Sequence, residues 1–194
     1  MKTMNGLPFL LLCGCLAFSA CTPKEREKDS KEIAENQNEK KFDNTEIEND
    51  TEFAVSAADG GMLEVQLGQL AQSKASSQQV KSFGKMMITE HSKANAELKA
   101  LAAQKNISLP TSLSDKNQKK YDDLAGKTGK DFDDEYTTFM VKDHKEDIDK
   151  FKKEADKGDD MELRSWAAGK ITTLEHHLEM AKQAESAVDS LRKL

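Results

Sequence analysis

The sequence predicts an all-α protein built around an antiparallel four-helix bundle, and three observations support this class. Only three of the 194 residues are proline and 6% are aromatic, whereas good helix formers such as Ala, Lys, Glu and Leu are common. From Thr51 onward, apolar residues recur with the 3.6-residue period of a helix. Breaks in this period divide residues 51–192 into four long segments, which predicts one bundle domain over that range.

The first two helices are expected to form a hairpin. Helix one is predicted from a cap at Asp50 or Thr51 to about residue 74, and helix two from a cap at Ser76 or Ser77 to about residue 104. The inner stripe of helix one carries small residues at helical spacing, which lets another helix approach closely. These small residues are Ala57, Gly61, Gly68 and Ala71.

A longer connection, residues 106–130, separates the second and third helices and is expected to hold a short helix over 115–124. Helix three is predicted over 131–156 and ends before Gly158. Helix four is predicted from Asp159 or Asp160 almost to the end of the chain. The long connection can cross the bundle, whereas the short ones join antiparallel neighbours.

The N-terminus has the layout of a secretory signal peptide over residues 1–20, with a basic start followed by an apolar stretch. Residues 18–21, Phe-Ser-Ala-Cys, resemble a bacterial lipobox, which predicts a lipid on Cys21 and anchoring in the outer membrane. Cys15 is a weaker rival for lipidation, and plain secretion with cleavage near Ala20 is the alternative. The lipid makes the membrane the expected partner, while a protein partner and an oligomer stay open.

Residues 21–50 are expected to act as a flexible tether between this lipid and the domain. Residues 22–50 include 16 charged side chains and only four clearly apolar ones, too few to offset the entropy lost on ordering. The formal net charge of −6 argues against a nucleic-acid partner.

Two segments with the same order of residue types indicate a candidate site. Residues 86–91 and 139–144 both read apolar, Met, β-branched, polar, acidic, His. Three histidines fall on the inward faces of three different helices, and one glutamate falls on that of the fourth. Imidazole and carboxylate groups on facing helices are suitable ligands for iron, manganese, zinc or copper. The candidate metal ligands are Glu64, His91, His144 and His177.

Neighbouring polar residues could orient these ligands through hydrogen bonds. Each of three acidic residues directly precedes a histidine, and a tyrosine lies on the inner stripe of helix three. These candidates are Glu90, Asp143, Glu175 and Tyr136. The alternative is that the same histidines and acids form a buried polar network that fixes helix register without a metal.

An ordered set of positions along the chain resembles one family of exported bacterial proteins. The set is Phe53, Ala57-Ala58, Gly61, Glu64-Val65, Gly68, residues 87–91, Pro110, Phe132-Asp133, Tyr136, Asp143-His144, Leu174 and His177. It is similar to the family called domain of unknown function 4142, whose members are often labelled outer-membrane proteins. The resemblance covers about residues 51–190 and implies a ferritin-like fold. Two positions depart from the family: Glu90 replaces a usual aspartate, and Ile171 a common proline.

Three functions stay open at this stage. The preferred one is a non-enzymatic envelope lipoprotein that binds a transition metal in its core. The others are a structural, interaction or stress-response module without metal, and a metal-dependent oxidoreductase. The Glu-x-x-His pattern of di-iron carboxylate proteins is absent, because the residues three before the histidines are Ile88, Val141, Thr173 and Leu174. A ferritin-type iron oxidase is therefore not expected, and no catalytic residue is assigned.

Overall fold

The computed structural model describes residues 28–192, and all its regular elements are helices. These are α1 Ser30–Phe42, α2 Glu48–Lys74, α3 Gln78–Gln104, α4 Asp115–Ala125, α5 Gly129–Lys157 and α6 Met161–Arg192. The all-α prediction is confirmed. None of the helices in this part of the chain is long and apolar enough to cross a membrane. The predicted signal peptide and Cys21 lie outside the described residues.

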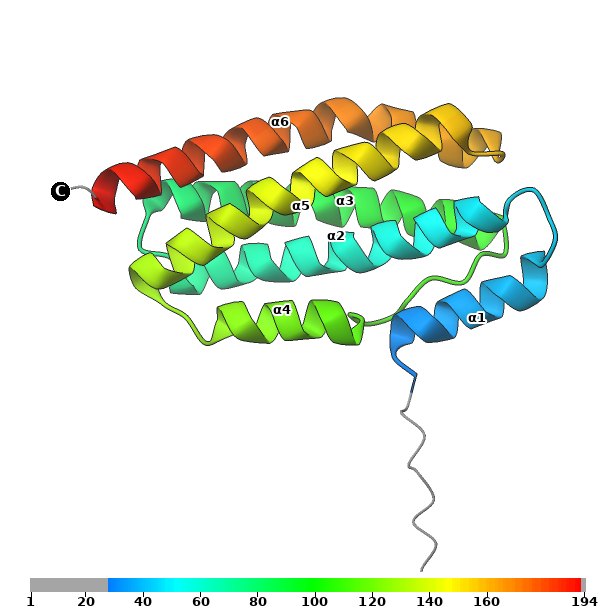
Figure 1. Cartoon of the computed structure of the whole chain (residues 1–194), viewed down its shortest axis with the longest axis horizontal. Coiled ribbons are helices and arrows are strands. Elements are labelled where there is room, and N and C mark those ends of the chain that lie inside the picture. Colours follow the sequence, from blue (N-terminus) through cyan, green and yellow to red (C-terminus); the bar gives the residue numbers. More distant parts are fainter. Residues whose placement is uncertain (1–27, 193–194) are drawn as a thin grey trace, which may run out of the picture.

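The four long helices lie side by side as two hairpins (Figure 1). Short turns connect α2 to α3 and α5 to α6, so the helices of each hairpin run antiparallel. Contacts between α2 and α5 and between α3 and α6 join the two hairpins around a common interior. The short helix α4 packs against the outside of α2, within the long connection where the sequence predicts it.

Three buried aspartates each hold the start of a neighbouring helix. Asp50 accepts hydrogen bonds from the backbone N–H groups of Asp159 and Asp160, just before α6. Asp133 accepts the N–H of Ser77 at 2.9 Å before α3, and Asp59 accepts the N–H of Ser114 at 2.9 Å before α4. These N–H groups lie just before the first turn of each helix and have no partner inside it, so each carboxylate satisfies donors that would otherwise be orphaned.

The structure corrects the predicted start of the first long helix, because Asp50 bonds to the residues before α6. α2 begins at Glu48, and its N-cap is Ile47, which makes no side-chain capping bond. Asp50 and Thr51 lie inside the helix and are buried. The prediction of a cap at one of these residues is therefore wrong, because their polar side chains serve other contacts. The predicted cap at Ser77 is confirmed, since its hydroxyl accepts the N–H of Val80.

Helix α1 corrects the predicted tether. Residues 30–42 form a helix that packs on α2, so the expectation of a flexible segment over 21–50 is wrong for this part. Its anchor is Asn38, 2% exposed, whose amide accepts the N–H of Ser108 at 2.7 Å and donates to the Ser108 carbonyl at 2.8 Å. Lys41 donates to the carbonyl of Asn106 at 2.9 Å. Polar contacts to the backbone of the connection after α3, rather than apolar burial alone, order this segment.

Helices α2 and α3 approach closely at two glycines. A Cβ atom added to Gly68 would lie 2.6 Å from the carbonyl oxygen of Gly84, and one added to Gly84 would lie 2.6 Å from the Cβ of Ala71. Real Cβ atoms do not approach other atoms this closely, so only glycine fits at either position. The close approach expected from the small residues of the first long helix is thus confirmed. Glu64 lies one turn of α2 from Gly68, and His91 lies two turns of α3 from Gly84.

Candidate metal centre

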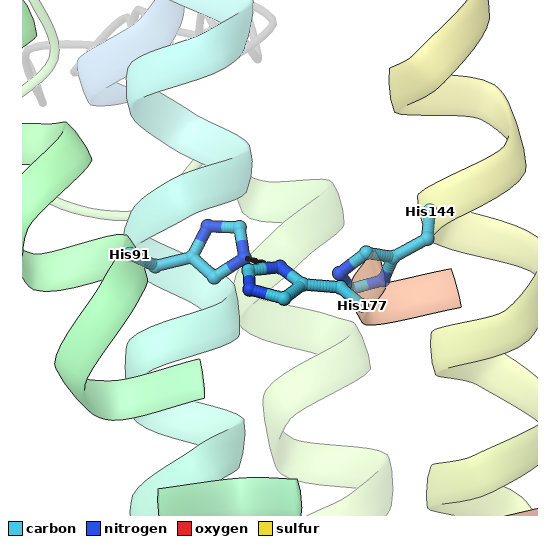
Figure 2. A group of neighbouring side chains, drawn as sticks. All are labelled: His91, His144 and His177. Carbon is cyan, nitrogen blue, oxygen red and sulfur yellow. Dashed lines mark hydrogen bonds between the residues drawn. The ribbon is translucent and has the colours of Figure 1, made fainter. Parts of the chain in front are cut away.

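Four buried side chains, one from each long helix, meet in the interior. Glu64 belongs to α2, His91 to α3, His144 to α5 and His177 to α6. His91 is 7% exposed and the other three are at most 1% exposed. Figure 2 shows the three imidazole rings pointing toward one another. The structure therefore brings together all four residues that the sequence marks as candidate ligands.

The four side chains form an unbroken row of contacts. Glu64 Oε1 lies 3.4 Å from His144 Nε2, and Glu64 Oε2 lies 2.7 Å from His91 Nδ1. His91 Nε2 lies 3.2 Å from His177 Nδ1. The row thus runs from His144 through Glu64 and His91 to His177. Each of its three contacts joins two atoms that can accept a hydrogen bond, so each needs a hydrogen between them.

The outer nitrogens of the two end histidines are already bonded to oxygen acceptors. His144 Nδ1 lies 3.0 Å from the carbonyl oxygen of Met140, and His177 Nε2 lies 2.9 Å from Oε2 of Glu90. A carbonyl or carboxylate oxygen only accepts, so the ring hydrogens of both histidines lie on these outer nitrogens. His144 Nε2 and His177 Nδ1 are consequently left as unprotonated acceptors that face the row.

The row therefore has fewer hydrogens than contacts. Neutral His91 brings one hydrogen, and Glu64 brings a second only when its carboxyl group is protonated. At most two hydrogens serve three contacts, so one pair of acceptor atoms always faces each other unbridged. In the structure, Glu64 Oε1 and His144 Nε2 are buried without a hydrogen-bond partner. Leaving a buried polar group unsatisfied costs on the order of 1–3 kcal/mol.

Burial prevents the histidines from supplying the missing hydrogen as a proton. It lowers the pKa of His91 and of His177 to about 4, and it is also the main cause that lowers the pKa of His144. Burial raises the pKa of Glu64 to about 8, although the nearby His144 acts in the opposite direction. Near neutral pH the three imidazoles are therefore uncharged and Glu64 retains a proton. The imidazoles therefore bring no positive charge to the unprotonated atoms of the row.

A second group of carboxylates adjoins Glu64. Asp143 and Asp147, one turn apart on α5, and Glu64 each offer an oxygen, and these oxygens lie within 4.8 Å of one another. Asp147 Oδ1 pairs with Lys150 Nζ at 2.8 Å, whereas Asp143 Oδ2 is buried without a hydrogen-bond partner. Burial, followed by the charges of Glu64 and Asp147, raises the pKa of Asp143 well above its usual value.

The four residues predicted to orient the ligands differ in where they lie and in what they contact. Glu90 bonds to His177, across from α3 to α6. Glu175 lies at the surface and pairs with Lys152 at 2.8 Å, so it is not brought to the site. Asp143 faces Glu64 rather than a histidine. The Tyr136 hydroxyl is buried without a hydrogen-bond partner, and burial raises its pKa.

Two contributors to the site are not among the residues predicted from the sequence. The Met140 carbonyl holds His144, but a backbone acceptor has no signature in the sequence. Asp147 completes the acidic group, and its spacing could have revealed it. Residues four apart share a helix face, so Asp147 had to lie beside Asp143.

A cavity of about 190 Å³ adjoins the site. Its lining includes Glu64, His91 and His177, and the exposed Lys93 also borders it. Its apolar lining is formed by Ala57, Phe151, Trp166 and Leu174. The cavity has room for several water molecules, at about 30 Å³ each. The cavity therefore offers an ion or a small molecule a place beside three of the four candidate ligands, whereas His144 does not line it.

Comparison with known proteins identifies the family of the chain. The model of a family described as domain of unknown function (DUF4142) matches residues 30–184. The chain belongs to this family. The DUF4142 match begins at Ser30, the first residue of α1, and so includes the segment that sequence reasoning assigned to the tether. No curated protein and no solved structure gives a significant match.

Proposed function

We propose that this DUF4142 protein holds one transition-metal ion inside a ferritin-like four-helix bundle. The ligands would be Glu64, His91, His144 and His177. The observation that carries the proposal is the row of three acceptor-to-acceptor contacts served by at most two hydrogens. A metal ion accepts lone pairs from several inward-facing atoms at once, so it would remove this deficit.

The geometry of the site supports this proposal. Two nitrogens bound tetrahedrally at about 2.0–2.1 Å from an ion are roughly 3.3 Å apart. His91 Nε2 and His177 Nδ1, separated by 3.2 Å, already match this spacing. One ligand nitrogen from each of the three histidines lies within 4.8 Å of the others, so a modest closure would surround an ion. The outer bonds to Met140 and Glu90 hold two rings in the tautomer that a ligand histidine needs.

The proposed role is to bind or buffer iron, manganese, zinc or copper without turnover. A metal-dependent oxidoreductase is the second candidate, because the cavity has room for a small oxidant beside Glu64, His91 and His177. Activity assays with the loaded protein separate these two roles. A structural module without metal is the reading that follows if no ion binds.

Metal analysis of the full chain tests the proposal. The chain is purified with a histidine-free tag, incubated separately with the four metals and dialysed, and its metal is measured by mass spectrometry. About one tightly bound ion per chain is expected for at least one metal. Replacing His144 by glutamine should weaken binding at least a hundredfold, about 2.7 kcal/mol.

The matched control is the neighbouring histidine of α6. His176 is exposed, so His176→Gln should bind metal as the unaltered chain does. Helical circular dichroism must be the same for both variants, so that a loss of metal reports on the site. Absence of metal from the unaltered chain, or equal metal in both variants, would refute the site.

We further propose that a lipid on Cys21 anchors this domain in the outer membrane, on its periplasmic or its outer face. The sequence Phe-Ser-Ala-Cys at residues 18–21 supports this proposal. The mass of the N-terminal peptide from membrane fractions should show an acylated Cys21, and Cys21→Ser should leave the chain unacylated. A native chain cleaved near Ala20 with an unmodified cysteine would contradict it.

A further inference from the structure

We propose that the chain binds a second, hard divalent cation beside the first, between Glu64, Asp143 and Asp147. The carboxylate of Glu64 would be shared by the two ions. This inference rests on the proposed function, because it makes Glu64 a ligand of the first ion as well. It assigns the second position only oxygen ligands, in contrast to the histidine-rich first position.

The backbone positions these three carboxylates together. Asp143 and Asp147 are four residues apart on α5, so they lie one above the other on the same face. Glu64 reaches them from α2, which contacts α5 across the interior. The nearest oxygens of the three side chains lie within 4.8 Å of one another. A cation between them could be bound by all three after small movements of the side chains.

Two carboxylate oxygens in this group lack a partner. Glu64 is 1% exposed and its Oε1 has no hydrogen-bond partner, and Asp143 Oδ2 is also buried and unpartnered. Buried carboxylate oxygens without a hydrogen-bond donor are costly. The two unpartnered oxygens indicate that the three carboxylates are arranged to bind a ligand. No surrounding side chain supplies a donor in its place.

One member of the group, Asp147, forms a direct ion pair with a lysine, whose charge also opposes, from a greater distance, the rise in pKa that burial causes in Glu64 and Asp143. Lys150 Nζ lies 2.8 Å from Asp147, and its side chain is 51% exposed. Because half of the lysine side chain is exposed, Lys150 can turn into solvent when a divalent ion enters. The ion would then contact Glu64 and Asp143 directly, which Lys150 does not do.

The ligand chemistry defines the class of ion. Carboxylate oxygens favour hard cations such as Mg²⁺, Ca²⁺ and Mn²⁺, whereas imidazoles favour zinc or copper. Ions that share ligands in two-metal sites are about 3.5–4 Å apart. A carboxylate between them reduces their mutual repulsion. The two positions would therefore select different metals while lying side by side.

Manganese titration of the zinc-loaded full chain tests the second position. One equivalent of Zn²⁺ is bound first, and free Mn²⁺ is then followed by electron paramagnetic resonance. One Mn²⁺ per zinc-loaded chain is expected. Replacing Asp143 by asparagine should weaken Mn²⁺ binding at least tenfold while the zinc content is unchanged.

The control is Asp149→Asn, an exposed position on the same helix, which should bind both ions normally. Bound zinc without Mn²⁺ binding, release of zinc by Mn²⁺, or equal Mn²⁺ binding by Asp143→Asn would overturn the second site and leave the first intact. Failure to bind zinc or any other transition metal would instead refute the proposed function, and this inference with it.

Discussion

Replacing Gly84 by valine is expected to lower the free energy of unfolding by about 3 kcal/mol or more. A Cβ at this position would lie 2.6 Å from the Cβ of Ala71 and 3.0 Å from the carbonyl oxygen of Gly68. Both atoms are fixed to the backbone of α2, so the helices must separate to admit the side chain. Glu64 lies one turn from this crossing, so its contact with His91 should loosen too.

Gly169→Val provides the matched comparison, because a Cβ at Gly169 meets no atom within 4 Å. This change should be neutral or stabilise by a few tenths of a kcal/mol, since valine is a better helix former than glycine. Urea unfolding followed by circular dichroism measures both variants. Equal stability of the two variants would show that the close approach of α2 and α3 is not required.

The second large effect expected is a tenfold rise in apparent metal affinity per pH unit, up to about pH 8. Burial raises the pKa of Glu64 to about 8, so below this pH the metal must displace one proton from the carboxyl group. His91 and His177, with pKa values of about 4, are already neutral above pH 5 and add no slope. Because Glu64 is half protonated at pH 8, lowering the pH from 8 to 6 should weaken binding about fiftyfold, or about 2.3 kcal/mol.

Glu64→Gln isolates this effect, because glutamine has a similar size but does not titrate. The variant should bind metal more weakly at pH 8, and its affinity should be nearly constant between pH 6 and 8. Competition with a chromophoric chelator at fixed pH values measures both proteins, after correction for protonation of the chelator. A flat profile for the unaltered chain would show that Glu64 is ionised without metal or is not a ligand.

Much of the helical architecture follows from local patterns in the sequence. The period of apolar residues marks the four long helices, because each must bury one face. The small residues of α2 predict a close neighbour, because the space above Gly68 is filled by the backbone of α3. The histidines and Glu64 share inward faces with apolar residues, and this placement is sufficient to predict that they are buried.

Contacts between distant polar groups could not be predicted in the same way. Asp50 looks like a helix cap in the sequence, but its partners lie more than 100 residues away. Helix α1 has too few apolar residues to predict a folded segment, and its order depends on how Asn38 matches the backbone of Ser108. The shortage of hydrogens in the histidine row depends on the Met140 carbonyl, which any residue would supply.

The packing of α1 on α2 would also set the length of the linker between the proposed lipid on Cys21 and the folded domain. Eight residues, 22–29, precede α1, and a chain of that length spans at most about 28 Å. A flexible segment extending to residue 50 would instead reach about 100 Å. The domain would therefore stay close to the bilayer surface. Ser30, the first residue of α1, accepts the N–H of Thr111. A pulling force on the proposed lipid would therefore act on the contacts of α1 before it acted on the packing among the four long helices.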